Sequence, residues 1–233
     1  MSLRARLLAA LADRLEAQPA APVLRVAVDG VDGAGKTTFA DELAGVLRAR
    51  GRTVLRASVD GFHAPRAVRY RRGRASPEGF YRDSYDLAGL RAALLDPLGP
   101  GGSGRYRTAI FDHTTDSPVR EPERVARPGS VLIVDGLFLH RPELREVWDD
   151  SMFLRVPFEV SVPRGAARGP GYGSPDPHAE ANRRYVEGNR LYFREADPER
   201  HAGAVVDNTD LAAPFFVWLS PVGTRREATS PAG

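Results

Sequence analysis

Residues 30–37 read GVDGAGKT, which completes the pattern G-x-x-x-x-G-K-T. A short apolar segment, Val23–Val28, precedes these residues, and apolar side chains at helical spacing follow them. Strand, glycine loop and helix in this order are the context in which the pattern holds phosphate groups. The segment therefore restricts the chain to an α/β fold built around a phosphate-binding loop.

The basic residues of the chain single out one position in this loop. Of 33 Lys and Arg residues, 32 are Arg and one is Lys, at position 36. A compact ammonium suits the β- and γ-phosphates of a nucleotide better than a planar guanidinium does. Inward-turned N–H groups and the following helix N-terminus add positive potential. With ATP or GTP and Mg²⁺ as cofactors, the expected binding residues are Gly30, Asp32, Gly33, Ala34, Gly35, Lys36, Thr37 and Thr38.

Composition excludes several other classes of protein. The absence of Cys rules out a disulfide scaffold, a thiolate zinc site and a cysteine nucleophile. The N-terminal residues lack the long apolar run of a secretory signal, and no run of about 18 apolar residues occurs, which predicts a cytoplasmic chain without membrane spans. The formal net charge of +3 does not favour nucleic acid as a partner. Five arginines between residues 66 and 74 favour a solvated or phosphate-contacting loop, since no folded recognition element accompanies them.

Apolar periodicity along the chain predicts alternating strands and helices, and hence a parallel sheet covered on both faces. We expect the three-layer α/β fold of P-loop NTPases, with a mostly parallel five-stranded sheet and a small lid. The expected units are an amphipathic helix in 1–22, a P-loop domain over 23–219 with the lid near 160–178, and a loose tail over 220–233. The expected helices are 3–17, Leu87–Leu95, Glu143–Trp148 and Ala179–Glu195, and the expected strands are Val23–Val28, Thr53–Val59, Tyr106–Phe111, Ser130–Val134, Met152–Val156, Ala204–Val206 and an edge at Phe215–Leu219.

Aspartates follow three of the expected strands, where ligands collect in such sheets. Asp135 ends the apolar run VLIVD, the pattern in which a carboxylate holds magnesium, although a strand end can also carry an Asp as a simple cap. Asp60 suits either proton removal from a substrate hydroxyl or a place in the Mg²⁺ shell; its alternative is a turn residue before glycine. The third of these aspartates is Asp112, which follows the expected strand Tyr106–Phe111.

Taken together, the segments GVDGAGKTT, SVDGFH, FDH, VLIVDG and VVDNTD resemble the uridine kinase family, in the nucleoside, phosphoribulokinase and pantothenate kinase branch of P-loop kinases. The resemblance covers about residues 23–210. It implies ATP- or GTP-dependent phosphorylation of a small-molecule hydroxyl, with a nucleoside such as uridine as the first expectation. It further implies Lys36 and Asp60 as catalytic residues, Asp60 being the general base, and Thr37, Asp135 and Asp60 around the metal.

The lid of this family carries arginines, which the resemblance places at Arg164 and Arg168. The two lie four residues apart, so on a helix they share one face and can close over the transferred phosphoryl group. Pro163 and Gly165 are unusual for that helix, and a solvated loop is the alternative.

The acceptor site departs from the family pattern. The family's D-H-P segment, whose Asp holds the sugar, has no match here, and its Asp falls near Phe80 with Glu78 or Asp83 as replacements. Tyr81 and Tyr85 fit either an acceptor site or the core. The candidate substrate residues are His63, Tyr70, Tyr81, Asp112, His113 and Arg120.

Two other nucleotide-binding classes are excluded because their motifs are missing. A regulatory GTPase needs an N-K-x-D motif, which a chain whose single Lys is in the P-loop cannot contain, and no L-S-G-G-Q signature of a transporter ATPase occurs. A pantothenate-type, sugar or nucleotide-monophosphate kinase and a non-catalytic ATP-sensing module remain open. The sequence also leaves open the acceptor, the choice between ATP and GTP, and whether the chain forms a homo-oligomer.

Overall fold

A computed structural model of the chain describes residues 1–169 and 173–222. Its centre is a six-stranded sheet in the order β10-β9-β8-β1-β7-β2. All neighbouring strands are parallel except β10, which pairs antiparallel with β9 at the edge. The predicted mostly parallel sheet is confirmed, but it has six strands rather than five, because the expected edge segment joins it as an antiparallel strand. The strands are β1 (Val23–Gly30), β2 (Val54–Ser58), β7 (Ser130–Gly136), β8 (Asp150–Arg155), β9 (Ala204–Asp207) and β10 (Phe215–Leu219).

Strand β1 lies in the middle of the sheet, between β7 and β8, and all eight of its residues are buried. Successive side chains of a strand point to opposite faces, so both faces of β1 must be covered. Leu24, Val26 and Val28 contribute to the hydrophobic core on one face, and Val23 and Ala27 contribute to the core on the other. The continuous apolar run before the glycine loop is therefore explained by burial on two sides.

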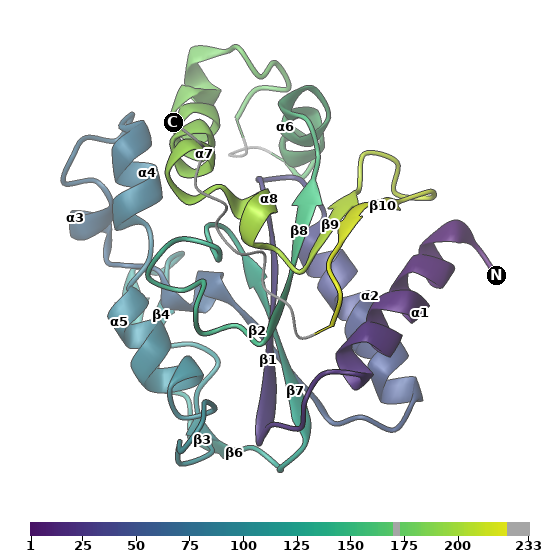
Figure 1. The fold of residues 1–233 in the computed structure, drawn as a ribbon. Helices are drawn as coiled ribbons and strands as arrows, with labels where there is room; N and C mark the ends of the chain where they lie inside the picture. The colour runs from purple at the N-terminus through teal and green to yellow at the C-terminus, as the bar shows by residue number, and fades with distance from the viewer. Residues whose placement is uncertain (170–172, 223–233) are drawn as a thin grey trace, which may run out of the picture.

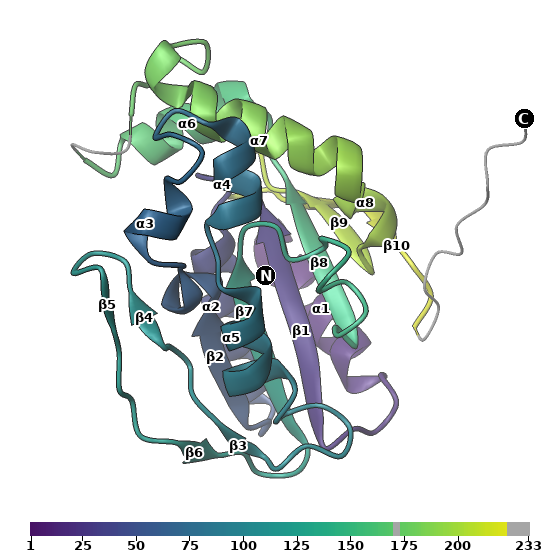
Figure 2. The ribbon, with the colours of Figure 1, turned by 90° about the vertical axis from the view of Figure 1, so that its left-hand side faces the viewer.

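Helices cover both faces of the sheet (Figures 1 and 2). On one face lie α1 (Leu3–Glu16) and α2 (Lys36–Ala49). The other face is covered by α4 (Pro77–Asp83), α5 (Leu87–Leu90) and the long α7 (Glu180–Ala196). The remaining helical segments are η1 (Val59–Phe62), α3 (Arg66–Arg69), η2 (Arg91–Leu95), α6 (Phe158–Ala166) and α8 (Pro198–His201).

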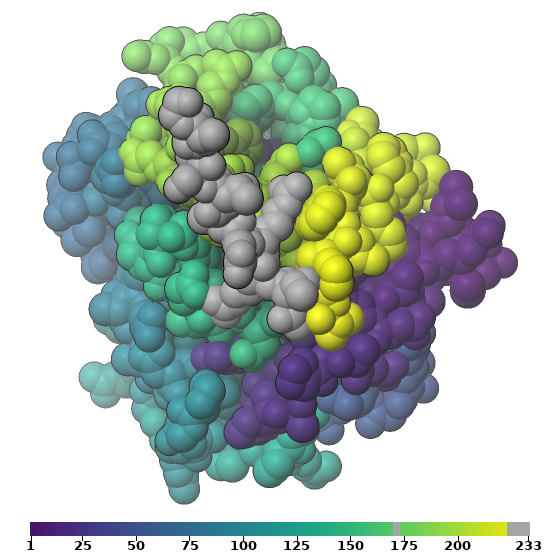
Figure 3. Space-filling view, in the orientation of Figure 1, coloured from purple at the N-terminus to yellow at the C-terminus, as the bar shows by residue number. Residues whose placement is uncertain are grey.

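The N-terminal helix is fastened to the carboxyl-terminal part of the sheet. The guanidinium of Arg14 donates to the Oγ of Ser220 at 3.0 Å and to the Oδ1 of Asp150 at 3.1 Å. In the space-filling view the purple helix accordingly lies against the yellow segment that contains β10 (Figure 3). Within the described residues, no helix has both the length and the apolarity to cross a membrane.

The single strand expected over Tyr106–Phe111 is wrong. The backbone N–H of Arg107 donates to the carbonyl of Ala93 and that of Ile110 to the carbonyl of Gly61, both at 2.9 Å, so the chain is bound to η2 and η1 rather than to the main sheet. Short two-residue strands flank this stretch and form two separate ladders: β3 (Arg105–Tyr106) with β6 (Arg124–Val125), and β4 (Phe111–Asp112) with β5 (Ser117–Pro118).

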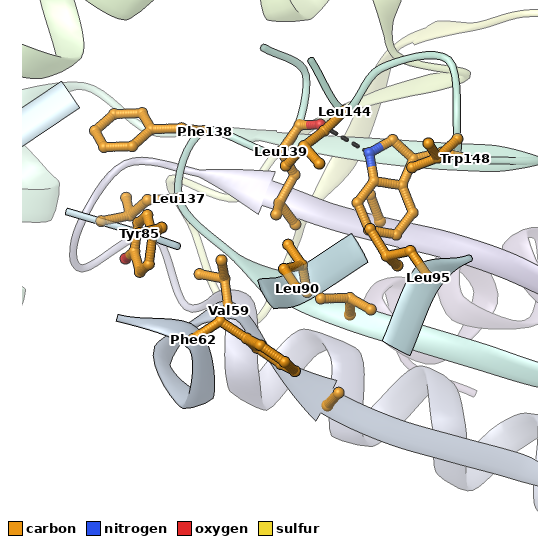
Figure 4. Close-up of a cluster of buried hydrophobic side chains, with 14 of the residues drawn as sticks. Val59, Phe62, Tyr85, Leu90, Leu95, Leu137, Phe138, Leu139, Leu144 and Trp148 are labelled. Carbon is orange, nitrogen blue, oxygen red and sulfur yellow. Dashed lines mark hydrogen bonds between the residues drawn. The ribbon is translucent and has the colours of Figure 1, made fainter. Parts of the chain in front are cut away.

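The helix expected over Glu143–Trp148 is also wrong, because this segment forms consecutive turns. The N–H of Leu144 donates to the carbonyl of Arg141, and the N–H of Val147 to the carbonyl of Leu144. Trp148 is buried and its indole N–H donates to the carbonyl of Leu139 at 2.7 Å (Figure 4). The apolar spacing therefore reflects a loop that folds inward over the core. In the expected helix over Leu87–Leu95, the last five residues form a wider π turn.

Candidate active site

The glycine loop occupies the space between the end of β1 and the start of α2 (Figure 1). Gly35 has φ +85°, a left-handed conformation that glycine adopts without steric cost. The Lys36 ammonium donates to the carbonyl of Val31 at 2.8 Å, and the Asn208 amide, at the end of β9, donates to the carbonyl of Ala34 at 2.7 Å. The loop is thus held from both sides, and the N-terminus of α2 supplies an anion site.

Helix α6 lies in close contact with the same loop at Gly33, whose φ is +74°. A Cβ at this position would lie 2.0 Å from the carbonyl oxygen of Ser161 and 3.1 Å from the backbone nitrogen of Gly165, both in α6. Glycine at position 33 therefore permits a direct contact between the loop and α6, which lies in the segment predicted as the lid.

Asp135, in β7, lies beside the first turn of α2. The Thr37 hydroxyl donates to its Oδ2 at 2.7 Å, and the guanidinium of Arg56, in β2, donates to its Oδ1 at 2.7 Å. A hydroxyl and a carboxylate oxygen are donors that suit Mg²⁺. No cluster of three or more His, Asp or Glu residues in the described parts of the chain could hold a metal alone.

Asp60 lies in the η1 turn directly after β2 and is exposed. The Tyr85 hydroxyl donates to its Oδ1 at 3.2 Å. Burial, together with the neighbouring carboxylate of Asp60, raises the pKa of Tyr85 well above 10, so the phenol remains a donor at neutral pH. His63 packs against Tyr85 and stacks on His113, with ring centroids 4.7 and 4.5 Å apart. Burial lowers the pKa of His63 below 6.5, which favours a neutral imidazole.

Asp32, inside the glycine loop, faces the same region. Its side chain is exposed to solvent, and the protein around its carboxyl group raises its pKa above the ordinary 3.8 by removing part of its hydration. The Lys36 ammonium opposes the rise, and the carboxylate of Asp60 adds to it. Two carboxylates and one ammonium therefore share this side of the loop, and the ionised form of Asp32 is disfavoured in the folded chain.

We expect Asp32→Asn to raise the melting temperature at pH 7 by no more than about 1 °C, because solvent screens an exposed carboxylate. A carboxyl whose pKa is raised on folding destabilises the fold when ionised, so the penalty is complete above the folded pKa and vanishes below 3.8. Melting curves of both proteins between pH 3 and pH 8 measure the difference. A gain that is as large at pH 3 as at pH 7 would contradict this electrostatic origin.

A buried polar network lies beneath the loop, and the sequence analysis missed it. Asp29, in β1, is fully buried, and its Oδ1 accepts the N–H of Gly30 at 2.7 Å. Its Oδ2 lies 2.8 Å from His140 Nδ1 and accepts the Tyr192 hydroxyl at 2.5 Å. His140 Nε2 lies 2.9 Å from the hydroxyl of Ser151. The signal in the sequence was Asp29, the one acidic residue of a strand whose other charged residue is Arg25.

This network joins the first glycine of the loop to α7. Burial and the carboxylate of Asp29 raise the pKa of Tyr192 well above 10. Tyr192→Phe removes one donor from a fully buried carboxylate, and we expect a loss of unfolding free energy of roughly 1–3 kcal/mol. Urea denaturation measures it. Tyr185→Phe, at a partly exposed position of the same helix, is the control and should change stability by less than about 0.5 kcal/mol; equal losses would contradict the role of the network.

The lid arginines differ in their placement. Arg164 lies in α6 and donates through one Nη to the carbonyl of Asn208 at 3.1 Å and through the other to the carbonyl of Thr209. Arg168 follows the end of α6. In this conformation Arg164 therefore joins α6 to the segment that supports the glycine loop. Residues 170–172 of the predicted lid and 223–233 of the predicted tail lie outside the described residues.

The acceptor candidates are scattered more widely. Tyr81 is 2% exposed and packs among core aromatic rings. Asp83, a candidate replacement for the family's sugar-holding Asp, is buried and paired with Arg71 and Arg72. Glu78, the other candidate, forms ion pairs with exposed arginines. Both carboxylates therefore already form ion pairs with arginines of this chain.

Tyr70 lies outside that core, with the guanidinium groups of Arg69, Arg74 and Arg184 between 5.0 and 5.6 Å from its ring. Asp112 accepts hydrogen bonds from Thr114 and Thr115 within the β4–β5 turn, and Arg120 is exposed after β5.

A cavity of about 310 Å³ lies between the starts of α6 and α7. None of the individually predicted site residues lines it. The structure thus brings Asp60, His63 and His113 together, buries Tyr81 among core rings, and bonds the carboxylate of Asp112, the neighbour of His113, within its own turn.

The fold and the site together define a class: a parallel sheet whose first strand ends in a phosphate-binding loop, with a carboxylate of the adjacent strand bonded to the loop's Thr. This is the P-loop kinase fold. Solved structures of kinases resemble this chain. A protein described as a possible uridine kinase from Bacillus stearothermophilus superposes with TM-score 0.68 over 88% of this chain and 99% of its own, at 24% identity.

Two other kinases resemble the chain. A protein named as a fructose transport system kinase from Silicibacter has TM-score 0.63 and 26% identity over 84% of this chain and 96% of its own. A D-glycerate 3-kinase from Cryptococcus neoformans has TM-score 0.52 and 11% identity over 91% and 97%. No family model and no curated protein matches the sequence. The resemblance to uridine kinase-like proteins is thereby confirmed at the level of the fold.

Proposed function

We propose that the chain is a kinase that transfers the γ-phosphoryl group of ATP or GTP to a hydroxyl of a small molecule, with a nucleoside such as uridine as the first candidate. The observation that carries this proposal is the contact between Thr37 and Asp135, 2.7 Å, beside a loop that contains the chain's one lysine. A phosphate cradle with a magnesium-type donor pair at its edge serves phosphoryl transfer.

In this mechanism the loop binds the triphosphate through its N–H groups, through Lys36 and through the N-terminus of α2. Thr37 and Asp135 would hold Mg²⁺, with Asp60 as a further carboxylate nearby. When bound, the ion neutralises charge on the β- and γ-phosphates. Arg164 and Arg168 are proposed to screen the transferred oxygens once α6 moves, which requires Arg164 to leave the carbonyls of Asn208 and Thr209.

Asp60 is the proposed general base. It is exposed, so an acceptor hydroxyl can reach it, and the Tyr85 hydroxyl bonds to one of its oxygens at 3.2 Å. That bond fixes the carboxylate and leaves the second oxygen available to accept the acceptor's proton as its oxygen attacks the γ-phosphate. Phosphoryl transfer needs positioning and charge stabilisation more than covalent chemistry, and these residues supply both.

The acceptor is proposed from the groups around Asp60. His63 and His113 form a stacked pair beside it, and Tyr70 lies on α3's end among arginines. Rings and a few polar groups suit a nucleoside or a sugar. A sugar acceptor is the second candidate, because the Silicibacter protein, 26% identical, is named as a fructose transport system kinase.

An ADP-release screen tests the proposal. The purified chain with MgATP or MgGTP is offered nucleosides, sugars, pantothenate, glycerate and nucleoside monophosphates in parallel. We expect ADP or GDP release above background with at least one uncharged polyhydroxyl acceptor. Binding of MgATP without turnover on any acceptor would instead support a nucleotide-sensing module, and turnover restricted to monophosphates would support a nucleotide-monophosphate kinase.

A further inference from the structure

Arg56 is a residue that neither the motifs nor the proposed mechanism uses. It lies in β2, two strands from the glycine loop, with its side chain 16% exposed. Its guanidinium donates to Asp135 Oδ1 at 2.7 Å, to the carbonyl of Ile133 at 2.7 Å and to that of Ala57 at 3.1 Å. Its Nε donates to the exposed Asp41 at 2.9 Å. These four contacts hold the guanidinium in one place.

The two oxygens of the Asp135 carboxylate have different partners. Oδ1 accepts from Arg56, and Oδ2 accepts from the Thr37 hydroxyl. The side chain of Asp135 is 3% exposed. A carboxylate so deeply buried is costly unless a cation lies next to it. In the described structure that cation is the guanidinium of Arg56.

We propose that Arg56 is the resident counter-cation of Asp135: it keeps this carboxylate paired while no metal is bound, and it opposes the entry of free Mg²⁺. The inference rests on the proposed assignment of Asp135 to the metal. A guanidinium on one oxygen repels a divalent ion at the other, whereas the negative phosphates of a bound nucleotide attract it. Magnesium therefore enters with the nucleotide, and Oδ2 beside Thr37 is the oxygen left to meet it.

Thermal unfolding in MgCl₂ without nucleotide tests this role. We expect 10 mM MgCl₂ to move the melting temperature of the wild-type chain by less than about 1 °C. In Arg56→Gln the unpaired carboxylate takes up Mg²⁺, and a site with a dissociation constant near 1 mM raises the melting temperature by about 3–6 °C. Arg56→Gln combined with Asp135→Asn should lose this shift. KCl at equal ionic strength gives the baseline.

Asp41→Asn is the matched control, because it removes the negative charge of another partner of the same guanidinium and leaves the contact with Asp135 intact. It should respond to MgCl₂ as the wild type does. Three results would overturn the proposal: a shift in Arg56→Gln no larger than in the wild type, a shift that survives Asp135→Asn, or a full shift in Asp41→Asn. None of these readouts depends on turnover, so they remain informative if the screen finds no acceptor.

A measurement on the unmodified chain covers the case in which Arg56→Gln does not fold. Calorimetric titration with MgCl₂ should give at least about tenfold weaker binding to the free chain than to its complex with ADP. Magnesium binding of equal strength with and without ADP would refute the proposed competition. An absence of ADP binding would count against the proposed kinase instead, while the titration of the free chain would still test Arg56.

Discussion

Lys36→Ala lowers phosphoryl transfer by at least about 10³-fold, an expected increase of about 4 kcal/mol in the activation barrier, while the chain stays folded. The ammonium of Lys36 projects from the first residue of α2 and bonds to the carbonyl of Val31, so its removal takes charge from the phosphate cradle without opening the core. The measurement is initial-rate ADP release with the acceptor found in the screen, alongside a melting curve.

Lys36→Arg is the matched control, since arginine is the cation that the chain uses at 32 other positions. It keeps the positive charge but replaces a point donor with a planar fork. We expect a loss of at least about 10²-fold, which would show that shape as well as charge matters. Near-full activity in Lys36→Ala would contradict the catalytic role, and calorimetry that detects neither MgATP nor MgGTP binding would remove the kinase proposal altogether.

Asp60→Asn lowers kcat by about 10²-fold or more and leaves the affinity for ATP little changed. An amide of the same shape keeps the contact with the Tyr85 hydroxyl but cannot take a proton from the acceptor. Steady-state kinetics in both substrates, together with a direct ATP titration, separate the two effects.

Tyr85→Phe supplies the comparison for Asp60. It removes the hydroxyl that fixes the carboxylate and leaves the carboxylate itself, so its loss of kcat should be smaller than that of Asp60→Asn. An equal fall in ATP affinity and kcat in Asp60→Asn would assign Asp60 mainly to the metal. A full-rate Asp60→Asn enzyme would require another base.

Much of the fold could be predicted from local patterns. The run before Gly30 and the run ending at Asp135 are largely apolar and are buried on both faces, as is typical of central parallel strands, and both lie where predicted. The two strands are neighbours in the sheet, which the local patterns did not predict, and this pairing brings Asp135 within 2.7 Å of the Thr37 hydroxyl. The fold neighbours agree with this part of the interpretation.

The errors occurred where non-local contacts decide the structure. The segment after Tyr106 has strand-like residues, but its N–H groups bond to Ala93 and Gly61, which no local pattern reveals. The turn region before Trp148 has helical spacing because it folds over the core. The contact of Arg56 could not be predicted for a similar reason. Arg56 is one of 32 arginines, and its partner, the carboxylate of Asp135, lies 79 residues away in the sequence.

The contact between Gly33 and Ser161 limits how this chain can be redesigned. Position 33 neighbours Asp32 in the predicted nucleotide-binding loop. Any side chain there, even a methyl group, would collide with the carbonyl of Ser161 and force α6 to shift. Protein engineers who seek a new acceptor should therefore leave this glycine untouched and vary the rings around Asp60 that we propose as the acceptor site.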